Sequence, residues 1–166
     1  MKNTNTKEQI LELLFNLPSK NFHIRECSRM LKISPPAVSK AVKELEKDNL
    51  IITEKSIIHS FIANIENPSF IQQKRVKNLS NVYTSGLFNF LKSSFPDQTI
   101  ILIDNYSKGT DNEKSQIEIA ILGSKEKSLS FVKFEEKLHR KIKIYFSEPK
   151  QLILNGIILQ GELKIW

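Results

Sequence analysis

The sequence predicts an α+β protein of two domains, the first mainly helical and the second alternating strands with helices. Apolar residues recur at helical spacing up to Leu50, and an isoleucine-rich extended stretch follows. After Pro96-Asp97 the pattern changes to short runs of β-branched residues separated by helical segments. We therefore predict one domain at residues 1–67 and another at 96–166, joined by a linker or dimerisation helix at 68–95.

The formal charge of +7 is divided unevenly between these parts. Residues 1–95 hold 14 Lys and Arg against 8 Asp and Glu, whereas residues 96–166 hold 11 against 10. A basic first part predicts contact with a polyanion. No apolar run is long enough for a bilayer, no hydrophobic signal region begins the chain, and the single Cys27 fits a reducing compartment. We therefore expect a cytoplasmic protein that neither associates with a membrane nor binds a cofactor. Its three histidines are far apart in the sequence, so we expect no metal site.

Two helices are predicted ahead of the most informative stretch. The first begins with a capping-box pair, Thr6 and Gln9, and ends before Pro18. The second runs from about His23 to Lys32 and presents Cys27 to the core, where we expect a small apolar residue rather than a reactive thiol.

The stretch ISPPAVSKAVKELEKDNL, residues 33–50, predicts a third helix with two different faces. Ser34 is a suitable N-cap and Pro35 a suitable first residue. One face is apolar and consists of Val38, Ala41, Val42 and Leu45. The opposite face is small and polar at its start and cationic along its side, as a helix that enters a major groove requires. Periodicity alone favours an ordinary amphipathic surface helix. The sequence on either side of this helix is what favours a groove-binding function.

Two helices joined by a tight turn form a helix-turn-helix pattern, and LIITEKSIIHSFIANI, residues 50–65, reads as a hairpin behind it. This order and the residues FHIRECSRMLKISPPAVSKAVKELEKDNLI resemble winged-helix transcription regulators of the kind common in archaea. The resemblance implies that the third helix enters the major groove of duplex DNA. It implies that the residues of this helix facing DNA are Ser34, Pro36, Ala37, Ser39, Lys40 and Lys43. Arg25 and Arg29 on the preceding helix are either phosphate contacts or solvated surface arginines. The wing offers Lys55, with His59 as a further candidate.

A long helix is predicted from Pro68 to Phe95, with Gly86 tolerated inside it and Lys74, Arg75 and Lys77 clustered near its start. Its apolar stripe consists of Val76, Leu79, Tyr83, Leu87, Phe90 and Leu91. The helix either packs between two domains or pairs with its copy in a homodimer.

The second domain is predicted to contain strands at 98–105, 115–123 and 141–147, and helices at 127–140 and 148–159. The block ILIDNYSKGTDNEKSQIEIAIL, which ends at Leu122, resembles the minimal nucleotidyltransferase domain of the polymerase-β type. Active members of that family carry Gly-Ser after the first strand and Asp-x-Asp on the next.

This chain departs from the family pattern where the chemistry is done. Asp104 and Asn105 stand at the Gly-Ser positions, and Gln116 and Glu118 at the paired acids. Lys143 stands where a third carboxylate is expected, and its charge would repel a divalent cation. The resemblance therefore implies a domain that is catalytically inactive.

Three functions follow from these patterns. The first is a transcription regulator that binds double-stranded DNA as a homodimer and uses its inactive second domain as a scaffold. The second is an active nucleotidyltransferase with an altered metal site made of Asp104, Asp111 and Glu118. The third is an antitoxin-like module that binds an unidentified protein partner.

Overall fold

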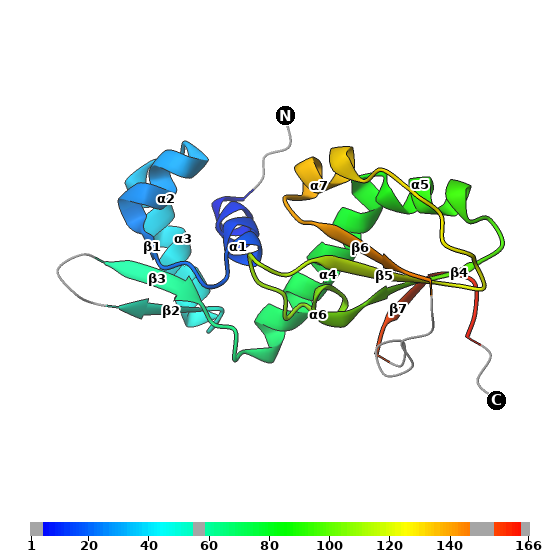
Figure 1. The fold of residues 1–166 in the computed structure, drawn as a ribbon. Helices are drawn as coiled ribbons and strands as arrows, with labels where there is room; N and C mark the ends of the chain where they lie inside the picture. The colour runs from blue at the N-terminus through cyan, green and yellow to red at the C-terminus, as the bar shows by residue number, and fades with distance from the viewer. Residues whose placement is uncertain (1–4, 55–58, 147–154, 164–166) are drawn as a thin grey trace. The chain divides into compact units, whose positions relative to one another are not determined.

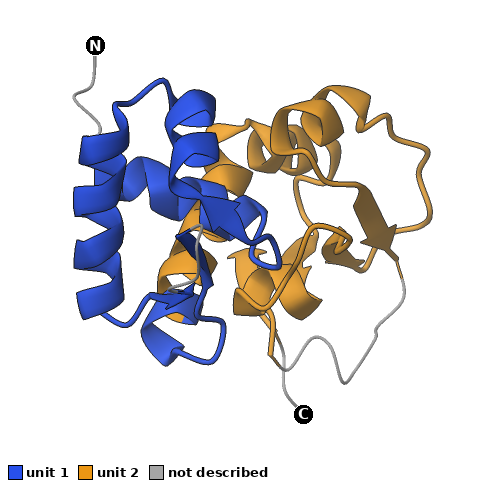
Figure 2. Cartoon of the chain, turned by 90° about the vertical axis from the view of Figure 1, so that its left-hand side faces the viewer, with its two compact units in different colours: residues 1–71 blue, residues 72–166 orange. Residues whose placement is uncertain are grey.

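The computed structural model describes residues 5–54, 59–146 and 155–163 and has a mixed α+β fold (Figure 1). The chain divides into two compact units, residues 1–71 (unit 1) and 72–166 (unit 2), coloured separately in Figure 2. The predicted domain boundaries at 67 and 95 remain predictions. Among the described residues, no helix has the length and apolar character needed to cross a bilayer.

Unit 1 places three helices ahead of a β-hairpin, as the sequence predicts. Its elements are α1 (Thr6–Asn16), β1 (Phe22–His23), α2 (Ile24–Leu31), α3 (Pro35–Lys47), β2 (Ile51–Glu54) and β3 (Ser60–Ala63). The strand order is β1-β3-β2, with β3 antiparallel to both neighbours. This is the arrangement of a winged helix-turn-helix, in which β2 and β3 form the hairpin called the wing.

The helix ends of unit 1 follow the sequence signals with two differences. Asn5 is the N-cap of α1, because its side chain accepts a hydrogen bond from the Lys7 backbone N–H at 3.2 Å, so the predicted Thr6–Gln9 capping box is wrong. Pro35 begins α3 and Ser34 is at its N-cap in an extended conformation, as predicted. The Ser34 side chain makes no capping hydrogen bond, contrary to prediction.

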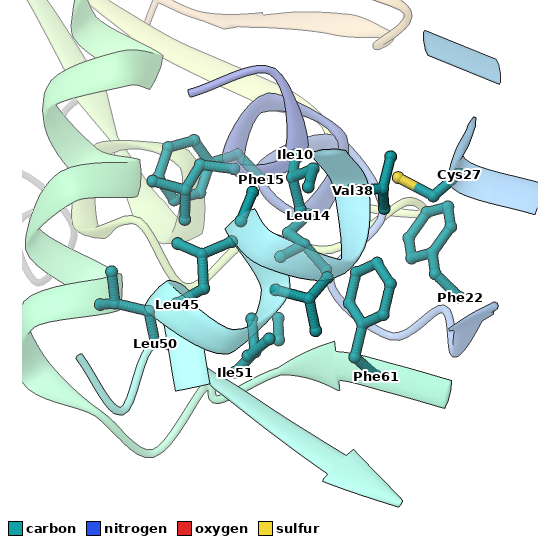
Figure 3. Close-up of a cluster of buried hydrophobic side chains, with 14 of the residues drawn as sticks. Ile10, Leu14, Phe15, Phe22, Cys27, Val38, Leu45, Leu50, Ile51 and Phe61 are labelled. Atoms are coloured by element: carbon teal, nitrogen blue, oxygen red, sulfur yellow. The ribbon is translucent and has the colours of Figure 1, made fainter. Parts of the chain in front are cut away.

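One apolar core holds unit 1 together (Figure 3). The stripe of α3 predicted from the sequence is buried throughout, with Val38 and Leu45 completely covered. Cys27 is also completely buried and lies beside Val38 and Phe22, as the core assignment predicts. The rings of Phe22 and Phe61 stack with their centroids 5.9 Å apart, which joins β1 and β3 to the helices.

The long helix predicted at residues 68–95 is two helices, α4 (Pro68–Thr84) and α5 (Leu87–Ser94). Gly86 separates them with a φ of 87°, a left-handed conformation that few other residues adopt readily. The Leu87 backbone N–H donates to the Ser85 hydroxyl at 3.2 Å, which starts α5. The predicted apolar stripe is consequently wrong for α4, since Val76 and Tyr83 are 69% and 43% exposed.

The buried face of α4 in unit 2 carries polar side chains instead. Lys74 is only 1% exposed; its ammonium donates to the Asp111 backbone carbonyl and lies 3.3 Å from the Asp111 carboxylate. Arg140 lies 3.6 Å from the other oxygen of that carboxylate, and the Asn78 amide donates to Asp111 at 2.6 Å. We call Lys74, Asn78, Asp111 and Arg140 the buried polar cluster. Of the three basic residues clustered near the start of the helix in the sequence, Lys74 is therefore buried, whereas Arg75 is exposed.

The rest of unit 2 is built on a mixed sheet with strand order β6-β5-β4-β7. Its elements are β4 (Thr99–Ile103), α6 (Asp104–Lys108), β5 (Ile117–Leu122), α7 (Val132–Leu138), β6 (Ile142–Tyr145) and β7 (Ile157–Gln160). β4 is antiparallel to β5 and β7, whereas β5 and β6 are parallel and connected through α7. Side chains from α4, α5 and α7 pack on one face of the sheet, and Ile101, Ile103 and Ala120 face the other side.

The closing helix predicted at residues 148–159 is also wrong in its described part. Residues 157–160 form β7, which pairs antiparallel with β4. Gly156 lies so close to β4 that an added Cβ would be 2.6 Å from Ile101 and 2.9 Å from the Leu102 carbonyl. A glycine followed by two isoleucines suits this close strand pairing better than a helix. Residues 148–154 of the predicted helix lie outside the described residues.

Candidate nucleic-acid interface

Helix α3 is divided sharply into a buried face and an exposed face. The buried stripe anchors it against the core, so its rotation about its own axis is fixed. That rotation leaves Pro36, Lys40 and Lys43 exposed, while Ala37 and Ser39 are half-buried. Ser34, at the start of the helix, is exposed as well. The residues assigned from the sequence to DNA contact on α3 are therefore accessible to a partner.

Helix α2 brings further candidate residues close to the start of α3. Lys32 ends α2 in a left-handed conformation with φ 57°, and the chain then turns into α3. Arg25 and Arg29 are both exposed on α2. They line one hollow of about 470 Å³ together with Ser28 and Pro35. The turn between the helices therefore joins the two arginines to the start of α3.

A larger hollow, which we call the front groove, has a volume of about 680 Å³. Its lining residues come from β1, from the starts of α2 and α3, and from the chain just before β3: His23, Ile24, Arg25, Pro35, Pro36, Ser39 and His59. Four of the candidate contact residues predicted from the sequence thus meet in one place: Arg25, Pro36, Ser39 and His59. Lys40 and Lys43 are not part of its lining.

No carboxylate lines either hollow among the described residues. Glu26, the acidic residue beside Arg25, forms an ion pair with Lys20 at 2.7 Å. The hydrogen bond from Lys20 lowers the pKa of Glu26, so this carboxylate is ionised and neutralised by its partner. On α3 the acids occur only towards the end, where Glu46 bonds to Thr53. The surface near the front groove is therefore cationic.

Of the two wing contacts predicted from the sequence, the structure describes His59, which lines the front groove together with His23 of β1. Lys55, the other predicted wing contact, lies outside the described residues. His59 lies just before β3, and the antiparallel pairing of His23 with Ser60 brings His23 beside it. The sequence offers no local signal for this pair, because a two-residue strand such as β1 has too little pattern to be recognised.

In unit 2, several residues of the block 100–122, for which the sequence predicted a nucleotidyltransferase-like motif, lie with Lys143 at one end of β4, β5 and β6. Asp104 follows β4 directly and has a φ of 57°, a conformation typical of glycine that Asp tolerates better than most residues. Glu118 on β5 is the register partner of Ile103 on one side and of Lys143 on the other. Asn105 and Gln116 are exposed nearby in sequence, in α6 and just before β5.

The Glu118 carboxylate already has a hydrogen-bond donor and a cation close by. The Tyr145 hydroxyl donates to it at 2.8 Å, and the Lys143 ammonium lies 4.6 Å from the Tyr145 ring centroid. The hydrogen bond with Tyr145 raises the pKa of Lys143, and the charge of Glu118 adds to this effect. A lysine that keeps its charge beside Glu118 opposes the binding of a cation there.

The altered metal site proposed for Asp104, Asp111 and Glu118 is not assembled. Asp111 is 2% exposed and belongs to the buried polar cluster, whereas Asp104 lies 3.9 Å from Lys108 at the surface. In the described part of the chain, no three His, Cys, Asp or Glu side chains are grouped as a metal ion would require.

Neither the family models nor the curated proteins compared with this chain gave a match. Among solved structures, the adhesin competence repressor AdcR from Streptococcus pyogenes is similar at 26% identity, over 57% of this chain and 69% of that chain, with a TM-score of 0.40. A double mutant of ZitR from Lactococcus lactis is similar at 25% identity, over 58% of this chain and 65% of its own, with a TM-score of 0.41. Scores of this size do not establish a common fold.

Proposed function

We propose that this chain is a sequence-specific regulator of transcription that binds double-stranded DNA through unit 1. The observation that carries the proposal is the front groove. It gathers Arg25 from α2 with Pro36 and Ser39 from α3 on a surface that no described carboxylate lines. A cationic surface with an exposed helix start is suited to phosphates and base edges together.

Binding proceeds in two stages in this proposal. The basic residues first draw the protein to the phosphate backbone, with release of counterions. Helix α3 then enters the major groove, where small side chains at Pro36 and Ser39 permit close approach and Lys40 and Lys43 reach phosphates or bases. Arg25 and Arg29 contact the backbone on the flank.

The test is a pair of double variants with equal loss of charge. Lys40→Ala with Lys43→Ala removes two exposed lysines of α3, and Lys92→Ala with Lys125→Ala removes two exposed lysines of unit 2. In anisotropy titrations of a bound duplex, we expect the first pair to weaken affinity about 30-fold or more. The second pair should have little effect. Equal affinities for parent and first pair would reject the placement of α3 in the groove.

We further propose that unit 2 is an inactive nucleotidyltransferase-like domain that serves dimerisation or the binding of a ligand or protein partner. Support comes from the left-handed backbone at Asp104, from the antiparallel pairing of β4 with β5, and from the lysine and tyrosine around Glu118. The proposal predicts no Mg²⁺-dependent binding of ATP by the full chain in calorimetry. Saturable binding that requires Mg²⁺ would favour the enzyme instead.

A homodimer is part of the same proposal, and α4 is its interface. Val76 and Tyr83 are exposed on this helix, with half-buried Leu79 between them at helical spacing. The rings of Tyr83 and Phe88 pack in a T-shaped arrangement with their centroids 5.1 Å apart, which widens the apolar surface. Two copies joined here would carry two α3 helices to the half-sites of one operator.

A further inference from the structure

The front groove contains two histidines: His23, to which the DNA-binding scheme assigns no role, and His59, which the resemblance gives only as a candidate contact of the wing. His23 is the N-cap residue of α2 and His59 precedes β3; both are exposed and both line the groove with Pro36 and Ser39. We infer that His23 and His59 are DNA-backbone contacts whose protonation tightens DNA binding as the pH falls. The inference rests on the proposed function, because it requires the start of α3 to face a duplex.

The placement follows from the strands, and not from the sequence distance of 36 positions between the two histidines. β1 and β3 are antiparallel, with Phe22 opposite Phe61 and His23 opposite Ser60. The Phe22–Phe61 stack in the core, 5.9 Å between centroids, holds this pairing from behind. The alternation along β1 therefore buries Phe22 and directs His23 outward, into the groove that Pro36 and Ser39 also line.

The charges around the histidines allow this effect. Arg25 shares the groove, and Lys40 and Lys43 are exposed on α3. Among the described residues, two acids lie near the histidines: Glu26 interacts with His23 but is paired with Lys20, and Glu54 lies opposite Ser60 on β2. A duplex adds phosphates to this set, and phosphates attract imidazolium far more than neutral imidazole. Histidine changes charge between pH 5 and 8, where carboxylates and lysines ordinarily do not.

The expected readout is the salt dependence of DNA affinity at two pH values. Each phosphate contact contributes about −0.9 to the slope of log K against log salt. Two additional imidazolium contacts should therefore make the slope steeper by about 1.8 per protomer at pH 5.5 than at pH 8. At low salt the affinity itself should rise about tenfold or more.

The experiment compares the full-length parent with His23→Gln/His59→Gln, in anisotropy titrations of one duplex. Glutamine keeps hydrogen-bonding capacity without a titrating charge, so the variant should match the parent at pH 8 and lose the response at pH 5.5. Each single variant should lose about half of it. His139→Gln is the matched control, because His139 is exposed in unit 2 and should leave the response unchanged.

Two outcomes would overturn the inference: a parent whose affinity is equal or weaker at pH 5.5, or a double variant that keeps the parental response. Neither outcome would contradict the proposed function, which the variant Lys40→Ala with Lys43→Ala tests independently at pH 8. Conversely, absence of DNA binding at pH 8 with an intact fold by circular dichroism would count against the proposed function itself.

Discussion

Cys27 illustrates how burial dominates the chemistry of a residue, with the charge of Glu26 as a smaller cause in the same direction. It is completely covered in the core of unit 1, and this burial raises the pKa of its thiol to about 11 from an ordinary value of 9.0. Because a thiolate is the nucleophilic form of cysteine, Cys27 is an inert core residue at neutral pH.

The raised pKa predicts how the stability of the protein changes in alkali. The pKa of the Cys27 thiol is higher in the folded state than in the unfolded state. Its contribution to the unfolding free energy is therefore fully present below pH 9 and is lost as the pH rises through about 11. Between pH 9 and pH 11, the unfolding free energy of the parent should fall by on the order of 2 kcal/mol more than that of Cys27→Val. Urea denaturation at each pH measures this difference. Identical pH dependence in both would contradict this account. Tyr106, whose pKa burial raises to about 12, should cause a later decline in both proteins.

The buried polar cluster predicts a large effect for one carboxylate. Asp111→Asn leaves Lys74 and Arg140 buried without their shared counter-ion, which should cost about 3–5 kcal/mol of unfolding free energy. Asp104→Asn is the matched control: its ion pair with Lys108 is at the surface, and Asn tolerates the same left-handed backbone, so the cost should be below about 1 kcal/mol. Similar costs for the two variants would mean that the cluster does not act as a buried ion pair.

At the level of single residues, the sequence predicted what apolar spacing determines and missed what depends on distant partners. Val38 and Cys27 are buried as predicted because their own helices dictate it. Lys74 is buried only because Asp111 and Arg140, far along the chain, surround it. His23 joins His59 through a strand pairing of the same long-range kind. Periodicity within one helix contains no information about such partners.

The elements of unit 2 show a second limit of sequence patterns. A short apolar run such as LILNGIIL can form a helix or a strand, and which one forms depends on whether an adjacent strand pairs with it. Here residues 157–160 pair with β4 and form β7, and Gly156 just before them lies close to the backbone of β4. The sequence also does not show whether the helix breaks at Gly86, because a glycine inside a helix is tolerated at a cost.

Glycine substitutions test the positions where backbone conformation matters. Gly86 and Gly123 have φ values of 87° and 76°, and an added Cβ would meet nothing closer than 4.0 Å. Alanine at either position should cost only the left-handed strain, about 1–2 kcal/mol. Gly161→Ala should cost more, because its Cβ would also lie 2.9 Å from the Thr99 backbone. Denaturation curves that rank Gly161→Ala as the mildest would contradict this description of the turn after β7.

For the molecule as a whole, the exposed stripe of α4 predicts the oligomeric state. Val76→Glu with Tyr83→Glu places charges in an apolar surface without disturbing the buried face of the helix. In sedimentation velocity the parent should be a dimer and the variant a monomer, because the interface would have to bury both carboxylates. The matched control, Gln73→Glu with Ser80→Glu, alters exposed polar positions of the same helix and should remain a dimer. If the parent protein is a monomer, the proposal that α4 forms a homodimer interface is wrong.

The central claim is that the cationic surface of unit 1 reads duplex DNA. The most direct test is a fluorescence-anisotropy titration of the full chain with fragments of its host's genomic DNA at 50 and 200 mM salt. We predict that most fragments bind weakly and lose affinity at least about a hundredfold between these concentrations, while a few bind about a thousandfold more tightly than the rest. Equal, weak binding of every fragment, or affinity that does not depend on salt, would contradict the account.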